Sequence, residues 1–313
     1  MRPVVTLTVN PALDLTVSVD RVASGPKLRC GRPRLDPGGG GINVARVLHR
    51  LGTATVALYA VGGLTGERLR DLIDREGFPH RPIAVADETR QSFTAHEEST
   101  GRQYRFVLPG PRLSANEWQG LLEITVEMAE RADLVVASGS LAPGLPDDFF
   151  ARVGKALDEQ GVRLVLDSSG PGLVTTLERA HVFLVKPNMH EIVELAGEEL
   201  AWPEDQADWA SALIAKGRAD VVVVTHGAEG AIVVTSDRRT QVRPPAMQVQ
   251  SAIGAGDSFI AGLCTGLVRG QPVAEAGALG MAAAAATLLT PGTELCHPDD
   301  VDRLCAKIEV RAI

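Results

Sequence analysis

Short apolar runs rich in β-branched residues alternate along this chain with longer segments whose apolar positions recur at helical spacing. The strand-type runs are Val4–Val9, Val56–Val61, Leu134–Ala137, Arg163–Asp167, Val182–Val185, Val221–Thr225 and Ala231–Thr235. The helical segments are Ile42–Leu51, Gly66–Glu76, Glu117–Arg131, Asp147–Gln160, Met189–Leu195 and Asp205–Lys216. Continuous apolar runs indicate strands buried on both faces. The order predicts an α/β fold in which helices cover both faces of a mostly parallel sheet.

Two segments, Asp14–Leu35 and Thr89–Leu108, break this pattern. Their apolar residues alternate, as in Tyr104-Phe106-Leu108, and no helix separates them from the flanking core strands. They predict a small antiparallel sheet rising from the edge of the main body, which would suit a lid that excludes water. An ordinary edge hairpin without a role is the alternative. Since no linker or internal repeat occurs, residues 1–313 are expected to form a single domain.

Composition and charge narrow the possible functions. The 313 residues are 45% hydrophobic and 22% charged, which is typical of a globular protein, and the formal net charge is −8. A nucleic-acid binder usually carries a basic face, so neither nucleic acid nor a broad anionic surface is an expected partner. Any anionic ligand must therefore meet a local cationic pocket.

The cysteines and apolar stretches predict a cytoplasmic protein. Cys30, Cys264, Cys296 and Cys305 form no CxxC pair and have no histidine at zinc-ligand spacing, so reduced thiols are expected. The N-terminus lacks the pattern of a signal peptide. The longest apolar stretch, Ala276–Thr290, is too short to span a membrane and predicts a buried helix.

Two glycine-rich turns carry the candidate chemistry. Gly254-Ala255-Gly256-Asp257 opens an apolar helix, where small residues let backbone N–H groups approach an anion and the helix dipole favours negative charge. Asp257 would stand at this anion hole as a base, or would only cap the helix. Gly38–Gly41 opens a second helix, and four consecutive glycines are costly in chain entropy unless a ligand needs close backbone approach.

Two other glycine-rich nucleotide sites do not fit this chain. A dinucleotide fingerprint follows the first strand directly, whereas Val4–Val9 is followed by Asn10-Pro11-Ala12-Leu13-Asp14 without a glycine. No Walker A sequence occurs either. A dehydrogenase and a P-loop kinase are therefore disfavoured.

The ordered set of motifs resembles the PfkB, or ribokinase-like, family of carbohydrate kinases from end to end. The segments that carry the resemblance are Lys27–Cys30, Gly38–Arg46, Thr89–Gln91, Gln103–Val107, Ser138–Leu141, Asp167–Gly170, Val185–Glu191, Gly254–Asp257 and Gly292–Thr293. Within the family the pattern is most similar to the branch that phosphorylates fructose 6-phosphate. The resemblance implies a three-layer α/β/α domain with a β lid, using ATP and Mg²⁺.

By this resemblance, Asp257 accepts the proton of the attacking sugar hydroxyl, and the N–H groups of Gly254, Ala255 and Gly256 stabilise the transferring phosphoryl group. Asn188 and Glu191 form an NxxE element that holds Mg²⁺, chiefly through water. The nucleotide positions it implies are Lys186, Asn188, Thr225, Gly227 and Gly230.

The resemblance also assigns the sugar and cation positions. Asp14, Gly39, Asn43 and Ser140 match sugar contacts. The substrate phosphate needs cations, for which Arg90 is the first candidate, followed by Lys27 and Arg29. Some family members bind K⁺ beside the anion hole, and the matching positions here are Ser251, Ile253, Thr287, Thr290, Gly292 and Glu294.

The choice of substrate rests on one motif. Kinases of the family that act on fructose 1-phosphate or tagatose 6-phosphate tend to read Gly-Gly-Lys-Gly, where this chain has Gly40 in place of lysine. This favours fructose 6-phosphate as acceptor and fructose 1,6-bisphosphate as product. A tagatose-6-phosphate kinase, a 1-phosphofructokinase and a catalytically silent sugar-phosphate sensor stay open as alternatives. The family further implies a homodimer joined through the lid.

Overall fold

The computed structural model describes residues 2–313. Within this range the strands are β1 (Val4–Thr8), β2 (Ala12–Val19), β3 (Arg34–Gly38), β4 (Thr55–Val61), β5 (His80–Ala84), β6 (Arg90–Glu97), β7 (Gln103–Val107), β8 (Leu134–Ser138), β9 (Arg163–Asp167), β10 (Val182–Val185), β11 (Ala219–Thr225), β12 (Ala231–Val234), β13 (Arg239–Arg243) and β14 (Glu309–Ala312). The α-helices are α1 (Gly40–Arg50), α2 (Gly63–Glu76), α3 (Ala115–Ala129), α4 (Phe149–Glu159), α5 (Gly170–Arg179), α6 (Met189–Ala196), α7 (Glu204–Ala215), α8 (Ala255–Val268), α9 (Val273–Leu288) and α10 (Pro298–Cys305). A short 3₁₀ turn, η1, covers Gly227–Glu229.

The main sheet has the strand order β14-β13-β12-β11-β10-β9-β8-β1-β4-β5 within the described chain. Pairing is parallel from β5 to β11 and antiparallel from β11 to β14, so the prediction of a mostly parallel sheet is confirmed. The chain runs from β1 to β4 on one side and later to β8 on the other. This reversal of order beside β1 is a topological switch point, where ligands of open α/β sheets bind.

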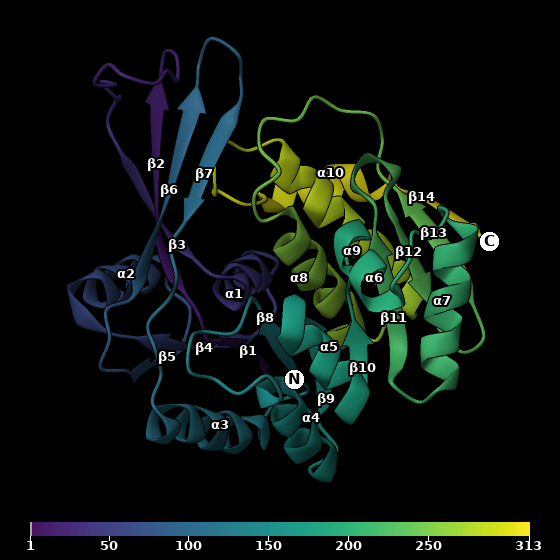
Figure 1. The fold of residues 1–313 in the computed structure, drawn as a ribbon. Coiled ribbons are helices and arrows are strands. Elements are labelled where there is room, and N and C mark those ends of the chain that lie inside the picture. The colour runs from purple at the N-terminus through teal and green to yellow at the C-terminus, as the bar shows by residue number, and fades with distance from the viewer. Residues whose placement is uncertain (1) are drawn as a thin grey trace.

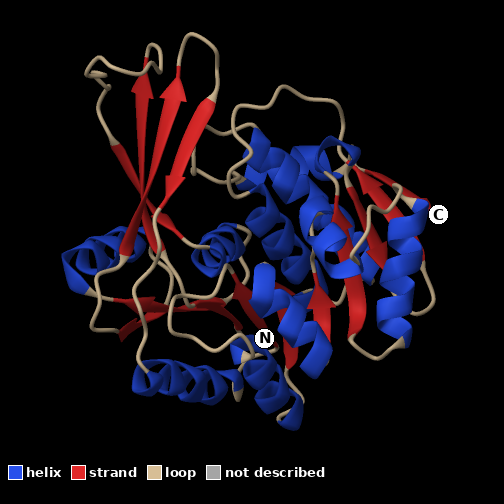
Figure 2. Ribbon diagram, in the orientation of Figure 1, coloured by secondary structure: helices blue, strands red, loops and turns tan. Residues whose placement is uncertain are grey.

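Helices cover both faces of this sheet, as the apolar runs predicted (Figures 1 and 2). Successive side chains of a strand point to opposite faces. In β8, Leu134 and Val136 join the buried cluster formed with α1, α8, α9 and α10, whereas Val135 and Ala137 join the cluster formed with α3 to α7. The predicted buried helix at 276–290 is α9. The result is a three-layer α/β/α body.

A second, small sheet projects from the edge of the main body (Figure 1). Its strand order is β3-β2-β6-β7, and the hairpins β2–β3 and β6–β7 are antiparallel as predicted. The join between the hairpins differs, because β2 and β6 pair in parallel. Both strands leave the same edge of the main sheet, β2 after β1 and β6 after β5, and therefore run outward in the same direction. Val17, Val19 and Ala95 form its own small buried cluster.

Two further findings concern the cysteines and membranes. All four cysteines are free; Cys264 and Cys296 are buried, and Cys30 and Cys305 are exposed. Among residues 2–313 no helix combines the length and the apolar character needed to cross a membrane.

Candidate active site

A cavity of about 370 Å³ lies at the carboxyl ends of the parallel strands, beside the switch point. The main body contributes the loops that follow β8 and β9 and the starts of α1 and α8, while the small sheet forms another wall. The lining residues are Ala12, Asp14, Gly39, Gly40, Asn43, Arg90, Ser92, Arg105, Val107, Ser138, Gly139, Ser140, Asp167, Ser168, Ser169, Glu191, Ala252, Ile253, Gly254, Gly256 and Asp257. Most of the predicted sugar and catalytic positions therefore meet in one place.

Asp257 lies in the first turn of α8, which begins after Gly254 in the left-handed conformation at φ 78°. A residue with a side chain would be strained there, and its Cβ would overlap Leu295. The first N–H groups of a helix have no partner within the helix and carry partial positive charge. The turn from Gly254 to Gly256 therefore presents backbone donors next to the carboxylate, although Ala255 N already donates to the Ala252 carbonyl at 3.4 Å.

The carboxylate of Asp257 is held from two sides. Asn43 Nδ2 donates to Asp257 Oδ2 at 2.9 Å, and Ser138 Oγ donates to Asp257 Oδ1 at 3.5 Å. Asn43 belongs to α1, which packs against α8 and starts after Gly39 at φ 119°. A Cβ on Gly40 would overlap Ser138 Oγ and lie 3.0 Å from the Ser138 carbonyl carbon. The glycine run thus lets α1 approach the end of β8.

The surroundings of Asp257 make it a candidate base. Burial raises the pKa of its carboxyl to about 7, and the negative charge of Asp167 adds to this; the contacts to Asn43, Lys186 and Ser138 lower the pKa and only partly offset it. A carboxylate with a pKa near neutrality can accept a proton and release it within one catalytic cycle.

Lys186 is buried beside the same helix start. Its ammonium pairs with Asp167 Oδ1 at 2.9 Å, and a Cβ on Gly256 would lie 3.6 Å from Lys186 Nζ. Burial lowers the pKa of Lys186, but Asp167, Glu191 and Asp257 outweigh burial and raise it. A fixed positive charge therefore lies next to the backbone donors of α8.

Asn188 and Glu191 form the capping box of α6. Asn188 Oδ1 accepts from the N–H groups of His190 and Glu191, and Glu191 Oε2 accepts from Asn188 N at 2.8 Å. The two side chains thus stabilise the start of the helix, and Glu191 also lines the cavity. Burial raises the pKa of Glu191, with a further contribution from Asp167.

The other predicted nucleotide positions lie along the same edge of the sheet. Asn188 bridges to Thr225 at the end of β11, and Gly227 and Gly230 enclose the turn η1. His226 in this turn stacks on Trp202, with ring centroids 4.5 Å apart. Thr225, Gly227 and Gly230 are not among the residues that line the cavity described above. They lie beside it, at the same edge of the sheet.

The small sheet brings charged residues to the cavity. Arg90 donates from three nitrogens to the carbonyl oxygens of Asn10, Pro11 and Leu108, at 3.0 to 3.4 Å, which fixes its guanidinium. Burial raises the pKa of Asp14 to about 6, against the nearby charges of Arg105 and Arg90. Two arginines and a carboxylate thus gather on the wall that the small sheet contributes to the cavity.

The predicted K⁺ positions gather behind the start of α8. Ser251 Oγ donates to the Gly292 carbonyl at 2.9 Å, and Thr290 Oγ1 donates to the Thr287 carbonyl at 2.8 Å. Ile253 N donates to Ser251 Oγ at 3.3 Å. The Glu294 carboxylate is turned away to Arg34 and His297. Hydroxyl and carbonyl oxygens suit a monovalent cation, so this donor set fits apart from the Glu294 side chain.

Among the predicted substrate-binding residues, Lys27 and Arg29 are the two that the cavity lining does not include. They are exposed on the coil between β2 and β3, away from the lining residues. Conversely, Asp167 and Ser138 line the cavity although the sequence analysis gave them no role there. Asp167 and Ser138 each end an apolar strand, and a polar residue at that position was a usable signal.

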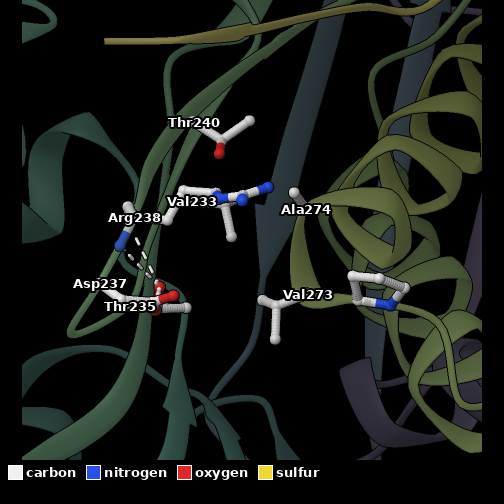
Figure 3. A pocket seen from close by; sticks show the side chains of 8 residues that line it. Val233, Thr235, Asp237, Arg238, Thr240, Val273 and Ala274 are labelled. Atoms are coloured by element: carbon white, nitrogen blue, oxygen red, sulfur yellow. Dashed lines mark hydrogen bonds between the residues drawn. The ribbon is translucent and has the colours of Figure 1, made fainter.

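A second hollow of about 330 Å³ lies between the β12–β13 turn and the start of α9 (Figure 3). β12 is antiparallel to β11, so this turn lies at the opposite edge of the sheet. Val233, Val273, Ala274 and Pro272 give it an apolar lining, and Thr235 donates to Asp237 within the turn. None of the predicted site residues lies there.

Similarity to known proteins points to the same kind of enzyme as the geometry of the site. The model of the pfkB family carbohydrate kinases matches residues 7–300. The chain is 46% identical to the ATP-dependent 6-phosphofructokinase isozyme 2 of Mycobacterium tuberculosis, covering 96% of this chain and 88% of that protein. It is 39% identical to the Escherichia coli isozyme 2, with 96% and 97% covered. The 1-phosphofructokinase of Bacillus subtilis is 32% identical, with 97% and 98% covered.

Solved structures of Escherichia coli phosphofructokinase-2 are also similar. The complex with substrates and products superposes with a TM-score of 0.93 at 38% identity, covering 97% of this chain and 99% of that one. Other structures of the same protein contain potassium or show a tetrameric inhibited form.

Proposed function

Because this chain belongs to the pfkB family of carbohydrate kinases, we propose that it transfers the γ-phosphoryl group of ATP to the 1-hydroxyl of fructose 6-phosphate, giving fructose 1,6-bisphosphate. One observation carries the proposal: Asp257, at the start of α8, faces a cavity whose opposite wall holds Asp14, Arg90 and Arg105. A base, backbone anion donors and a cationic clamp are the parts that phosphoryl transfer to a sugar phosphate requires.

In the proposed step, the substrate O1 attacks the γ-phosphorus while the bond to the β-phosphate oxygen breaks and ADP leaves. The proton of the 1-hydroxyl passes to Asp257, whose pKa of about 7 suits a base at neutral pH. The N–H groups of Gly254, Ala255 and Gly256 receive the charge on the transferring group, with Lys186 beside them.

The substrate is held from the walls of the cavity. We assign its hydroxyls to Asp14, Gly39, Asn43 and Ser140, which line the cavity. We assign its phosphate to Arg90 and Arg105, since a guanidinium can grip a phosphate with two hydrogen bonds. Lys27 and Arg29 would add to this clamp only if the coil between β2 and β3, from this chain or a second copy, approached the mouth.

The nucleotide would extend from the start of α8 along Lys186, Asn188, Thr225, Gly227 and Gly230. Asn188 and Glu191 fit Mg²⁺, because Glu191 lines the cavity with a carboxylate and magnesium keeps several of its waters. Bound there, Mg²⁺ would neutralise charge on the ATP phosphates.

We propose a K⁺ site at Ser251, Ile253, Thr287, Thr290 and Gly292, with Glu294 contributing its carbonyl oxygen at most. That carbonyl accepts from Arg50 at 2.6 Å. The nearness of these oxygens to Gly254 would let the cation order the turn that supplies the backbone donors. A potassium complex of the similar Escherichia coli protein supports the idea.

We also propose that the small sheet acts as a lid and joins two copies of the chain. Phe106, Val107 and Leu108 are each more than half exposed at the end of β7, which leaves apolar surface that a second copy could cover. Assembly of a related protein is known from its tetrameric form. Four free cysteines fit a cytoplasmic location, where thiols stay reduced.

The alternatives are a tagatose-6-phosphate kinase and a 1-phosphofructokinase. Two observations favour fructose 6-phosphate. This chain has Gly40 in place of the lysine of those enzymes. It is also 46% and 39% identical to the two 6-phosphofructokinases, against 32% to the 1-phosphofructokinase. The presence of Asp257 with its complete glycine turn disfavours a silent sensor.

The test is to incubate the protein with MgATP and fructose 6-phosphate and identify the product by ³¹P NMR. The proposal expects a second phosphate on carbon 1, and a fall of ~10²-fold or more in turnover for Asp257→Asn. A different position of phosphorylation, no transfer, or an equally active Asp257→Asn would each overturn part of it.

A further inference from the structure

A buried arginine of α1 lies one helical turn after Asn43. The Arg46 side chain is 3% exposed, and its guanidinium pairs with Glu76 of α2 at 2.6 Å. Its NH1 group points the other way, to Asn43 Oδ1 at 3.4 Å, the Thr293 carbonyl at 3.3 Å and the Pro37 carbonyl at 3.5 Å. A buried charge is costly unless it is paired. Glu76 meets that need, but it does not explain why NH1 reaches Asn43.

The amide of Asn43 lies between Arg46 and Asp257. Its nitrogen donates to Asp257 Oδ2 at 2.9 Å, and its oxygen faces Arg46 NH1. A guanidinium can only donate hydrogen bonds, and an ionised carboxylate can only accept them. The two neighbours therefore require the same orientation of the amide, with oxygen toward Arg46 and nitrogen toward Asp257.

We propose that Arg46 is a positioning residue for phosphoryl transfer, which fixes the amide orientation of Asn43 so that Asn43 donates to the Asp257 carboxylate. This inference deepens the proposed function and rests on it. Arg46 touches neither the cavity nor the reacting atoms. Its hydrogen-bonded path to the base runs through Asn43, and its charge also lowers the pKa of Asp14 on the small sheet.

Loss of this donor changes the proton affinity of the base. The Asn43 hydrogen bond lowers the pKa of Asp257 against burial and the charge of Asp167. Without Arg46 the amide is free to turn its oxygen toward the carboxylate, which then gains by binding a proton. A hydrogen bond to an ionised group is strong enough to move a pKa by about one unit.

A substitution of Arg46 leaves the other charged groups around Asp257 in place. Asp257 is faced by Asp167 from the end of β9 and by Lys186 after β10. Arg46 is faced by Glu76 from α2, by Arg50 on its own helix and by Asp36 from β3. None of these groups is altered, but removing the Arg46 charge also acts on Asp14. A shift that runs through Asp14 would persist in an Asn43→Ala background, whereas a shift that reports the Asn43 contact would not.

Arg50 provides a matched control. It lies one turn after Arg46 on α1, binds the same Glu76 at 3.3 Å, and donates to the carbonyls of Glu294 and Cys296. It has the same chemistry and the same acidic partner, but no contact with Asn43. Arg46→Met and Arg50→Met therefore differ in the one contact under test.

The experiment measures kcat/KM for fructose 6-phosphate from about pH 5.5 to 9.5. For Arg46→Met, the acidic limb should move about one pH unit upward and most activity should return at high pH. For Arg50→Met, the acidic limb of the kcat/KM profile should stay at the wild-type pH, even though this variant also loses its ion pair with Glu76 and some stability. In an Asn43→Ala background, Arg46→Met should add no further shift.

If Arg46→Met fails to fold, Arg46→Lys and Arg50→Lys form the second pair. A lysine keeps the charge opposite Glu76 but lacks the planar fork that bonds Glu76 and Asn43 together, so the same direction of shift is expected at position 46 only. An unmoved limb in the position-46 variant, an equal shift at position 50, or a shift that persists without Asn43 would overturn the inference.

A wild type that turns over no sugar phosphate would instead contradict the proposed function. The role of Arg46 is then tested by unfolding. The stability advantage of Asp257→Asn over the wild type should stop growing at a pH near the pKa of Asp257. In an Arg46→Met background, the same advantage should stop growing at a higher pH. An unchanged pH would refute the inference without reference to turnover.

Discussion

Replacing the base by its neutral isostere should stabilise the fold while it removes activity. The pKa of Asp257 rises from its ordinary value of 3.8 to about 7 in the folded chain. Between these values the unfolded chain has lost its proton and the folded chain has kept it. The free energy of unfolding therefore falls by ~1.4 kcal/mol for each pH unit in this range. The total loss of stability from ionising Asp257 is at most ~4 kcal/mol, reached above pH 7.

Asp257→Asn is free of this penalty, because its amide does not ionise. Its advantage over the wild type should be absent below the unfolded pKa, grow from about pH 4 to about pH 7, and stay constant above. The hydrogen bonds of the carboxylate to Asn43 and Ser138 already enter the pKa of about 7 and are not subtracted again, so we expect an advantage close to the bound of ~4 kcal/mol at pH 8.

The assay is urea unfolding at pH 5 and pH 8 for the wild type, Asp257→Asn and Asp71→Asn. Asp71 is exposed on α2 and is not among the residues that line the cavity, so it controls for the removal of one negative charge. The Asp257→Asn advantage should be larger at pH 8 than at pH 5, whereas the control should show none. A variant that is less stable than the wild type at pH 8, or an advantage independent of pH, would refute the claim that burial strains this carboxylate.

Three further predictions concern activity. In the wild type, kcat/KM should rise about tenfold per pH unit below pH 7 and level off above it, because Asp257 must be ionised to accept a proton; a profile flat from pH 5 to 9 would exclude this base. Arg105→Met and Arg90→Met should each raise KM for fructose 6-phosphate by ~10- to 100-fold with a smaller effect on kcat, since a charge-assisted hydrogen bond is worth ~1.5–3 kcal/mol. Neither change should alter KM for ATP, and an equal loss for both substrates would argue for damage to the fold instead. Gly40→Ala should lower kcat/KM by ~10-fold or more, because its methyl group displaces Ser138 from Asp257; wild-type kinetics would contradict the close approach of α1 to β8.

The main sheet was predictable because its central strands are buried on both faces. Runs such as Val221–Val224 are almost wholly β-branched, and no other element suits them. β13 (Arg-Thr-Gln-Val-Arg) and the edge strand β14 (Glu-Val-Arg-Ala) escaped prediction because, taken together, their polar and charged residues outnumber the apolar ones. Helix α5 escaped as well, since it begins with Gly-Pro-Gly, which is more typical of a turn.

The site was predictable where glycine runs and polar residues follow buried strands. Asp257 was found in this way, whereas Asn43 and Asp14 came from the resemblance to the family; the structure brings all three to one cavity. The pairing of Lys186 with Asp167 was not predictable, because it joins the ends of adjacent strands that only the sheet order places side by side. The parallel join of β2 to β6 and the contact from Arg46 to Asn43 depend likewise on three-dimensional arrangement.

The central claim is tested most directly by kcat/KM of the wild type, with saturating MgATP, for fructose 6-phosphate, tagatose 6-phosphate and fructose 1-phosphate. The account predicts a preference for fructose 6-phosphate of at least ~10-fold, as one well-placed contact can provide. A preference for either of the other two sugars, or no turnover of any of the three, would contradict it.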